Sequence, residues 1–190
     1  MKRVVVGITG ASGTAYGKRV LERLAAMPDV ESHLVITAAG RLTLGLETDL
    51  EATDLEELAD HVHTIKNVAA PIASGSFRTA GMIVAPCSIR VLSAVATSAS
   101  SDLLTRAADV TLKERRPLVL LVRETPLHAG HLRLMSQAVE AGAIIYPPVP
   151  AFYIRPATLD DIIDHTVARA LELLGITAND ISRWEGPPGR

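Results

Sequence analysis

The residue pair with the clearest chemical potential is Arg123-Glu124, which follows six uninterrupted apolar residues at 117–122. An apolar run bounded by charge and proline predicts a strand buried on both faces, as in a parallel sheet. Ligands of open parallel sheets bind just beyond the carboxyl ends of the strands. Arg123 could bind an anion at such an end, and Glu124 could carry a proton. A solvated ion pair at an ordinary strand end explains this segment equally well when it is considered alone.

A second candidate is the glycine-rich segment GITGASGTAYG at 7–17. Glycines let the backbone turn sharply and approach a ligand closely, and Ser12 is placed to cap a helix whose N-terminus favours an anion. Tight packing of strand against helix is the structural alternative. A dinucleotide site would combine Gly-x-Gly-x-x-Gly with an acidic residue about 20 residues later. Here glycines fall every third residue and 35–40 contains no carboxylate, so a mononucleotide phosphate fits better than NAD.

Two further segments carry side chains that could react or bind a metal. Cys87-Ser88 follows the apolar run 81–86 at another expected carboxyl end. Because no basic partner adjoins Cys87 in sequence, a structural cysteine is favoured over a nucleophile. We expect Ser88 to cap a helix or contact a phosphate. His61 and His63 have no third ligand at metal-site spacing, so surface histidines are favoured and no metal site is predicted.

The elements that position these residues alternate along the chain. We expect strands near 3–9, 32–37, 81–86, 117–123 and 143–146. We expect helices near 14–27, 39–47, 54–61, 88–99, 102–113, 127–141 and 158–174. Such alternation predicts an α/β fold in which helices cover both faces of a parallel sheet. The connection 66–80 has no clear periodicity, and long loops in compact domains are often functional.

Composition limits the possible classes of protein. A length of 190 residues suits one domain, expected at 1–176, followed by a polar tail at 177–190 that is mobile or docked on a neighbour. No apolar run approaches the roughly 20 residues of a membrane span, and no signal-peptide layout opens the chain. A net charge of −2 with scattered basic residues argues against nucleic acid. One cysteine fits a cytoplasmic location.

Taken together, many segments resemble the flavin prenyltransferase family, the UbiX-type flavoproteins, and more closely the small B subunits of aryl-acid decarboxylase systems. The matching segments are GITGASG (7–13), LET (46–48), ASGSFRT (73–79), PCS (86–88), RAADVTLKERRP (106–117), VRETP (122–126), PAFY (150–153) and VAR (167–169). The resemblance runs from the first strand to about Ile176. It implies a Rossmann-like (flavodoxin-like) three-layer sandwich that forms a homo-oligomer, typically a dodecamer, with FMN bound between subunits.

The resemblance also implies an activity. Such enzymes join the dimethylallyl group of dimethylallyl phosphate to N5 and C6 of reduced FMN without a metal, and a partner prenyl-FMN-dependent decarboxylase receives the product. The implied catalytic residues are Ser12, Glu47 and Glu124. The implied FMN contacts are Gly10, Ala11, Ser12, Thr37, Ser88 and Arg123. The implied phosphate-binding residues are Arg106, Lys113, Tyr153 and Arg169, whose cations would stabilise the departing phosphate.

The sequence departs from the family pattern at four positions. Ala38 replaces a common lysine, Val91 a common threonine, Asp102 a common asparagine, and Arg133 a common glutamate. The first three concern flavin affinity. Ala38 and Val91 motivate one alternative function, a non-catalytic FMN-binding accessory subunit of a decarboxylase complex. Another alternative is a cysteine-decarboxylase-like flavoprotein, but its usual Pro-x-Met-Asn motif does not occur here. The choice between a monophosphate and a pyrophosphate prenyl donor stays open.

Overall fold

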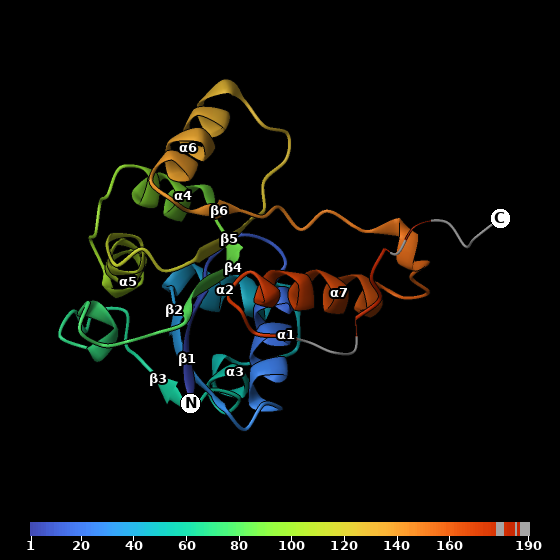
Figure 1. Cartoon of the computed structure of the whole chain (residues 1–190), viewed down its shortest axis with the longest axis horizontal. Coiled ribbons are helices and arrows are strands. Elements are labelled where there is room, and N and C mark those ends of the chain that lie inside the picture. The colour runs from blue at the N-terminus through green and yellow to red at the C-terminus, as the bar shows by residue number, and fades with distance from the viewer. Residues whose placement is uncertain (178–180, 185, 187–190) are drawn as a thin grey trace.

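The computed structural model describes residues 1–177, 181–184 and 186 (Figure 1). In this part of the chain six parallel strands form one sheet with the order β3-β2-β1-β4-β5-β6. The strands are β1 (Lys2–Ile8), β2 (Val30–Ile36), β3 (His61–Val62), β4 (Gly81–Cys87), β5 (Leu118–Val122) and β6 (Ile144–Ile145). The parallel α/β fold expected from the sequence is therefore confirmed.

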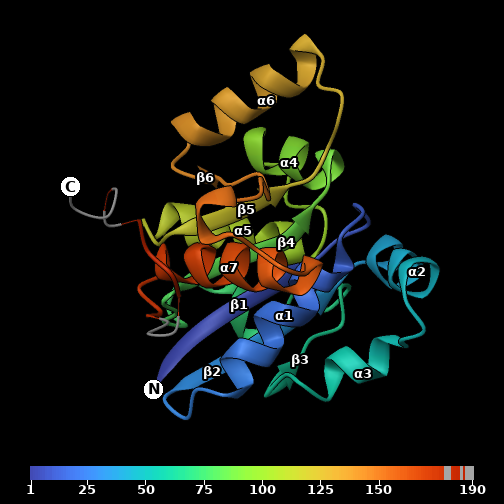
Figure 2. The same ribbon diagram turned by 90° about the vertical axis from the view of Figure 1, so that its right-hand side faces the viewer.

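Helices cover both faces of the sheet, which gives three layers (Figures 1 and 2). The α-helices are α1 (Thr14–Ala25), α2 (Ala38–Glu47), α3 (Ala52–Glu56), α4 (Ile89–Ala96), α5 (Leu103–Lys113), α6 (Ala129–Glu140) and α7 (Leu159–Glu172). Two short 3-10 helices are η1 (Pro71–Ala73) and η2 (Phe152–Ile154). Helices α1 and α7 contribute to the hydrophobic core on one face, and α4, α5 and α6 contribute to the core on the other.

Strand β5 shows why its sequence is uninterruptedly apolar. Val119 and Leu121 belong to the core under α1 and α7, while Leu118, Leu120 and Val122 belong to the core under α4, α5 and α6. Successive side chains of a strand point to opposite faces, so a strand covered on both sides needs apolar residues throughout. Each such side chain contributes about 1.5–3 kcal/mol when fully buried.

The order of the strands reverses between β1 and β4. From β1 the chain proceeds outward to β2 and β3, then returns to place β4 beside β1 and continues to β5 and β6. At such a reversal the connections leave the two strands toward opposite faces and open a crevice beyond their carboxyl ends. The loops after Ile8 and Cys87 border this crevice.

Two elements differ from the sequence-based expectation. The helix expected at 54–61 spans only Ala52–Glu56, and His61–Val62 instead forms β3 at the edge of the sheet. Two residues are too few to show a strand's alternating pattern, so β3 could be found only through its pairing with His33 and Leu34 of β2.

The C-terminal tail is partly described. Arg183 forms an ion pair with Glu172 of α7, and the ring of Trp184 lies 5.9 Å from that of Tyr153. These residues therefore pack on their own chain, while 178–180, 185 and 187–190 of the expected tail lie outside the described residues. Among the helices that are described, none combines the length and apolar character needed to cross a membrane.

Candidate functional site

A cavity of about 380 Å³ lies at the carboxyl ends of the central strands. Three residues predicted to bind FMN line it: Gly10 after β1, Thr37 after β2 and Ser88 after β4. Its volume falls in the range of small-molecule sites, about 300–1,000 Å³. The predicted flavin contacts from three separate loops therefore meet at one place.

Three helix N-termini border this cavity. Thr37 caps α2 by accepting a hydrogen bond from the Gly40 amide at 2.9 Å, and Ser88 caps α4. Asp102 caps α5, where its Oδ1 accepts from the Thr105 amide at 2.9 Å. Helix N-termini carry unpaired N–H groups and partial positive charge, which favour an anion. The N-termini of α2 and α4 therefore fit the phosphate end of FMN, whereas the N-terminus of α5 already holds the Asp102 carboxylate.

The cavity also contains two polar residues that the sequence analysis missed. The Thr9 hydroxyl is buried, donates to the Pro86 carbonyl at 2.7 Å and accepts from the Ser88 amide at 2.9 Å. It thus ties the β1 loop to the β4 loop at the reversal of strand order. Arg90 lines the same cavity from the first turn of α4. The hydrogen bonds of Thr9 exist only because β1 and β4 are neighbours, so the sequence could not show them. Arg90 could have been found, because it lies two residues after the predicted helix cap Ser88.

The glycines of the first loop divide between the two interpretations given above. A Cβ on Gly10 would lie 2.5 Å from the Cβ of Ala39, so the loop at the cavity packs closely on α2. A Cβ on Gly17 would lie 2.5 Å from the Ala85 carbonyl, so this glycine packs α1 against β4. The packing interpretation therefore suits both glycines, and Gly10 in addition lines the cavity.

The N-terminus of α1 already holds an anion, the carboxylate of Glu47. Glu47 accepts hydrogen bonds from the Thr14 amide and hydroxyl, both at 2.9 Å, and from the Gly13 amide at 3.0 Å. Partial burial by itself would raise the pKa of Glu47, but hydrogen bonds from Ser12, Thr14 and Gly13 outweigh it and hold this pKa below its ordinary value. Glu47 therefore stays ionised and fixes the loop that carries Ser12.

The expectation that Ser12 caps α1 is wrong. Gly13 occupies the N-cap position with a φ of 102°, and no side chain at that position caps the helix. The Glu47 carboxylate takes the amides instead, because a charged acceptor binds N–H groups more strongly than a hydroxyl does. Ser12 is exposed and is left next to Glu47, while the neighbouring Ala11 is buried.

Arg123 and Glu124 lie at the carboxyl end of β5, as predicted, and both are exposed. The Arg123 amide donates to the Cys87 carbonyl at 3.1 Å, and a Glu124 carboxylate oxygen accepts from the Thr125 amide at 3.0 Å. Within the described part of the chain these two side chains form no ion pair with each other. Burial raises the pKa of Tyr16, and the positive charge of Arg123 offsets part of that rise, so Arg123 lies near α1.

Cys87 is fully buried, and burial raises the pKa of its thiol to about 12. A thiol with this pKa carries almost no thiolate at neutral pH, and thiolate is the nucleophilic form. The structural interpretation of Cys87 is therefore confirmed, and Ser88 is confirmed as a helix cap.

Two predicted phosphate-binding residues lie on α5. The Arg106 guanidinium pairs with Asp109 at 2.8 Å and donates to the Ala73 carbonyl at 3.3 Å. Lys113 Nζ lies 2.5 Å from a Glu114 carboxylate oxygen. Helix α5 connects β4 to β5, so it returns toward the amino ends of the strands. Its last residue, Lys113, lies about 15 Å along the helix axis from its first, on the side away from the cavity.

The other two predicted phosphate-binding residues lie on the opposite face of the sheet. The Tyr153 hydroxyl is 3.2 Å from Nε2 of His165 on α7, and Arg169 of α7 pairs with Glu172. Helices α5 and α7 are separated by the sheet (Figure 1). The structure therefore brings the predicted flavin contacts Gly10, Thr37 and Ser88 together within one chain, but not the four phosphate-binding residues.

Three departures from the family pattern lie at the cavity. Ala38, Val91 and Asp102 all line it. The lost lysine and threonine and the added carboxylate would each weaken binding of a phosphate there. Arg90 supplies a cation in the same cavity, and its positive charge offsets part of this loss of phosphate affinity.

His61 and His63 lie away from this cavity, on β3 and just after it. Glu31 and His33 of the neighbouring β2 lie beside them. The side chains beside His61 and His63 thus come from another strand, which the sequence spacing does not reveal.

The comparisons with known proteins agree with this architecture. The model of the Flavoprotein family matches residues 1–170. The flavin prenyltransferase UbiX of Escherichia coli strain K12 is 57% identical over 188 residues, which cover 98% of this chain and 100% of the relative. A crystal structure of AnUbiX with FMN and dimethylallyl pyrophosphate superposes with a TM-score of 0.95 at 48% identity, covering 98% of this chain and 99% of that chain.

A second solved structure is that of a dodecameric FMN-dependent UbiX-like decarboxylase from Escherichia coli O157:H7. Its TM-score is 0.93 at 46% identity, covering 97% of this chain and 100% of that chain. The fold and the cavity at the strand ends are those of an FMN-type α/β flavoprotein. With these full-length similarities, the chain belongs to the flavin prenyltransferases of the flavoprotein family. The resemblance to the UbiX-type flavin prenyltransferases inferred from the sequence motifs is confirmed.

Proposed function

We propose that this chain transfers the dimethylallyl group of dimethylallyl phosphate to reduced FMN, giving prenylated FMN for a partner decarboxylase. The observation that carries the proposal is the 57% identity to a flavin prenyltransferase over the whole chain. The cavity at the strand ends supports it, because three of the six predicted flavin contacts, Gly10, Thr37 and Ser88, line it.

The loops after β1, β2 and β4 would hold FMN. Thr37 and Ser88 present the N-termini of α2 and α4 to its phosphate, Arg90 adds a positive charge, and Gly10 forms part of the cavity wall. Arg123, at the end of β5, would contact the flavin from the other side of the crevice. Bound reduced FMN supplies the nucleophilic N5 and C6 positions.

The cations on α5 and α7 would bind the phosphate of the prenyl donor. Lys113 provides a point charge, while Arg106 and Arg169 provide planar donor groups. Negative charge grows on the phosphate as its bond to the prenyl carbon breaks, so positive charge placed there lowers the barrier. Glu124 and Ser12 would move the proton that ring closure releases, and the departing phosphate would accept it.

The chain's own geometry supports a site shared between subunits. Lys113 is the last residue of α5, at the end away from the cavity, and Arg169 lies on the opposite face of the sheet. If these residues bind one phosphate beside FMN, they must come from different copies of the chain. A dodecamer, the state of the UbiX-like relative from Escherichia coli O157:H7, would provide such boundaries.

We also expect the enzyme in the cytoplasm, since its single cysteine is buried and reduced.

The direct test is anaerobic incubation of the chain with reduced FMN and dimethylallyl phosphate, followed by mass spectrometry of the extracted flavin. The proposal predicts a mass gain of one five-carbon prenyl unit and the release of phosphate. A parallel incubation with the pyrophosphate donor determines the donor, because AnUbiX was crystallised with dimethylallyl pyrophosphate.

Bound but unmodified flavin with both donors would contradict the proposal. That result would favour the accessory FMN-binding subunit, the alternative motivated by Ala38 and Val91, which line the cavity. Turnover of a C-terminal cysteine peptide in place of prenyl transfer would favour the cysteine decarboxylase.

A further inference from the structure

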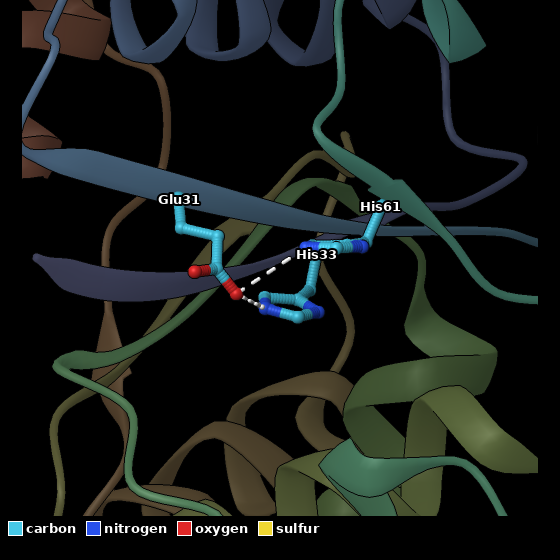
Figure 3. Close-up of side chains that lie close together, drawn as sticks. All are labelled: Glu31, His33 and His61. Carbon is cyan, nitrogen blue, oxygen red and sulfur yellow. Dashed lines mark hydrogen bonds and ion pairs between the residues drawn. The ribbon is translucent and has the colours of Figure 1, made fainter.

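A cluster of histidines and a glutamate lies at the edge of the sheet, apart from the flavin cavity (Figure 3). Glu31 and His33 are two residues apart in β2 and therefore point to the same face. His61 of β3 pairs in register with His33, which stacks the two imidazole rings with centroids 4.7 Å apart. Strand pairing thus brings three metal-ligating side chains together from two segments distant in sequence.

The ligand atoms have the separations of a metal site. Glu31 Oε1 lies 2.9 Å from His33 Nε2 and 3.4 Å from His61 Nε2, and the ligand atoms of the cluster all lie within 4.8 Å of one another. Bonds of about 2.0–2.2 Å to a tetrahedral ion place neighbouring ligands roughly 3.4 Å apart. We propose that Glu31, His33 and His61 form a binding site for one divalent transition-metal ion of the zinc class.

The surroundings of His33 orient it as a ligand. His33 Nδ1 lies 3.0 Å from His63 Nε2, and the His33 and Phe77 rings form a T-shaped pair with centroids 5.1 Å apart. When His33 Nδ1 donates its proton to His63, His33 Nε2 presents its lone pair to the ion. Metal-binding histidines characteristically use the second ring nitrogen in this way.

One cation already contacts the cluster. Arg3 Nε lies 3.1 Å from Glu31 Oε1, and the Arg3 guanidinium also packs over the ring of Phe77 at 4.7 Å. Oε1 is also the oxygen that faces His33 and His61, so an ion bound to it would share this oxygen with Arg3. This arrangement holds the carboxylate in place, as second-layer hydrogen bonds do for metal ligands generally.

The site is accessible from solvent on one side. The His61 side chain is 53% exposed, whereas those of Glu31 and His33 are 11% and 4% exposed. A hollow of about 250 Å³ lined by Glu31, Asp60 and His61 opens beside the cluster. An ion would therefore enter from this hollow, bind two buried ligands, and be closed in by His61, with water completing its coordination.

The donor set selects the class of ion. Two imidazoles and one carboxylate suit zinc and neighbouring transition metals, whereas magnesium prefers an octahedron of oxygens. Glu31 and His33 lie in the amino-terminal half of β2, and the flavin cavity lies beyond its carboxyl end. The ion therefore acts as a structural link between β2 and the two-residue strand β3, outside prenyl transfer.

The test is titration calorimetry of the untagged chain with zinc chloride, paired with thermal unfolding. The wild-type chain should bind one zinc ion, and zinc should raise its melting temperature. His61→Ala should weaken zinc binding by at least about tenfold, and His63→Ala by about tenfold or more through the orientation of His33. His61 is exposed, so its variant should fold normally without zinc.

His128→Ala serves as the matched control, because His128 lies on a different element and caps α6. This variant should bind zinc as the wild type does. The proposal is overturned if the wild-type chain binds no zinc, if His61→Ala and Glu31→Gln bind it unchanged, or if magnesium competes equally. These readouts do not involve prenyl transfer, so failure here leaves the proposed enzymatic function untouched.

Discussion

The flavin-binding half and the phosphate-binding half of the proposed active site are built in different ways. Loops after three neighbouring strands place Gly10, Thr37 and Ser88 around one cavity within a single chain. Lys113 and Arg169 lie on helices that cover opposite faces of the sheet. A parallel sheet gathers loop residues at its carboxyl edge by its topology alone. Residues on opposite helical layers can meet around one small ligand only across a subunit boundary.

Substituting Lys113 by alanine should distinguish the two halves most clearly, because it should lower prenyl transfer without changing FMN affinity. We expect prenyl transfer to fall by about 10²–10³-fold, because one charge that stabilises the leaving phosphate is lost. FMN affinity should stay unchanged, since Lys113 does not line the flavin cavity. Single-turnover assays with saturating reduced FMN and fluorescence titration of FMN measure the two effects.

Lys66→Ala is the matched control for this prediction, because Lys66 is an exposed lysine of the long connection. It should leave both quantities unchanged. Equal losses of FMN binding and of transfer in Lys113→Ala would mean that the two halves are not separate.

Glu47→Gln tests the loop that adjoins both halves. The neutral amide loses the charged acceptor at the N-terminus of α1, which should cost about 1 kcal/mol of stability at pH 7. The folded-state pKa of Glu47 lies below its ordinary value of 4.5. Its contribution is therefore fully present above that value and is lost as the pH falls through the lowered folded-state pKa.

Melting temperatures of the wild type and Glu47→Gln between pH 7 and pH 3 measure this effect. The difference between them should shrink as the pH falls below about 4.5. A constant difference over this range would show that ionised Glu47 does not hold the loop.

Asp102→Asn should increase the affinity for FMN without affecting the phosphate-binding half. Asparagine caps a helix as well as aspartate does, so α5 should keep its stability. The substitution removes a negative charge from the cavity, and FMN should bind at least about threefold more tightly at low ionic strength. Asp49→Asn, at an exposed position on the loop after α2, is the control and should have no effect.

Unchanged FMN affinity in Asp102→Asn would place the flavin phosphate away from this cavity. Salt titration provides a second check, since added salt should reduce the difference between the variant and the wild type.

The smallest effect is expected at Cys87, beneath the flavin-binding half. Its folded-state pKa of about 12 leaves the thiol protonated at pH 8, so thiol reagents should modify the folded chain far more slowly than the unfolded chain. Prenyl transfer should survive such treatment. Rapid modification of the folded chain with loss of activity would contradict the structural interpretation of Cys87.

The sequence alone was sufficient for most of the fold because strands such as β5 must be apolar on both faces and helices must alternate with them. It located Thr37 and Ser88 correctly at strand ends for the same reason. It failed at β3, whose two residues carry no pattern, and at Thr9, whose hydroxyl acquires its partners only when β1 and β4 become neighbours.

The capping of α1 shows a different limit. Ser12 has the right residue type and place for a cap, but Glu47, more than thirty residues later, takes the helix amides. The carboxylate of a residue distant in sequence replaces the local hydroxyl as acceptor, and no local sequence motif predicts this replacement. The histidine cluster was hidden in the same way, because the pairing of β3 with β2, and not sequence spacing, brings His61 beside Glu31 and His33.

The most direct test of the divided active site is complementation between two inactive variants. Lys113→Ala and Arg169→Ala chains are unfolded together, reassembled as mixed oligomers, and assayed for prenyl transfer beside each variant reassembled alone. If one site takes Lys113 and Arg169 from different subunits, random mixing restores about one site in four. The account predicts this partial recovery. Activity no higher than that of the separate variants, with oligomers and FMN binding intact, would contradict it.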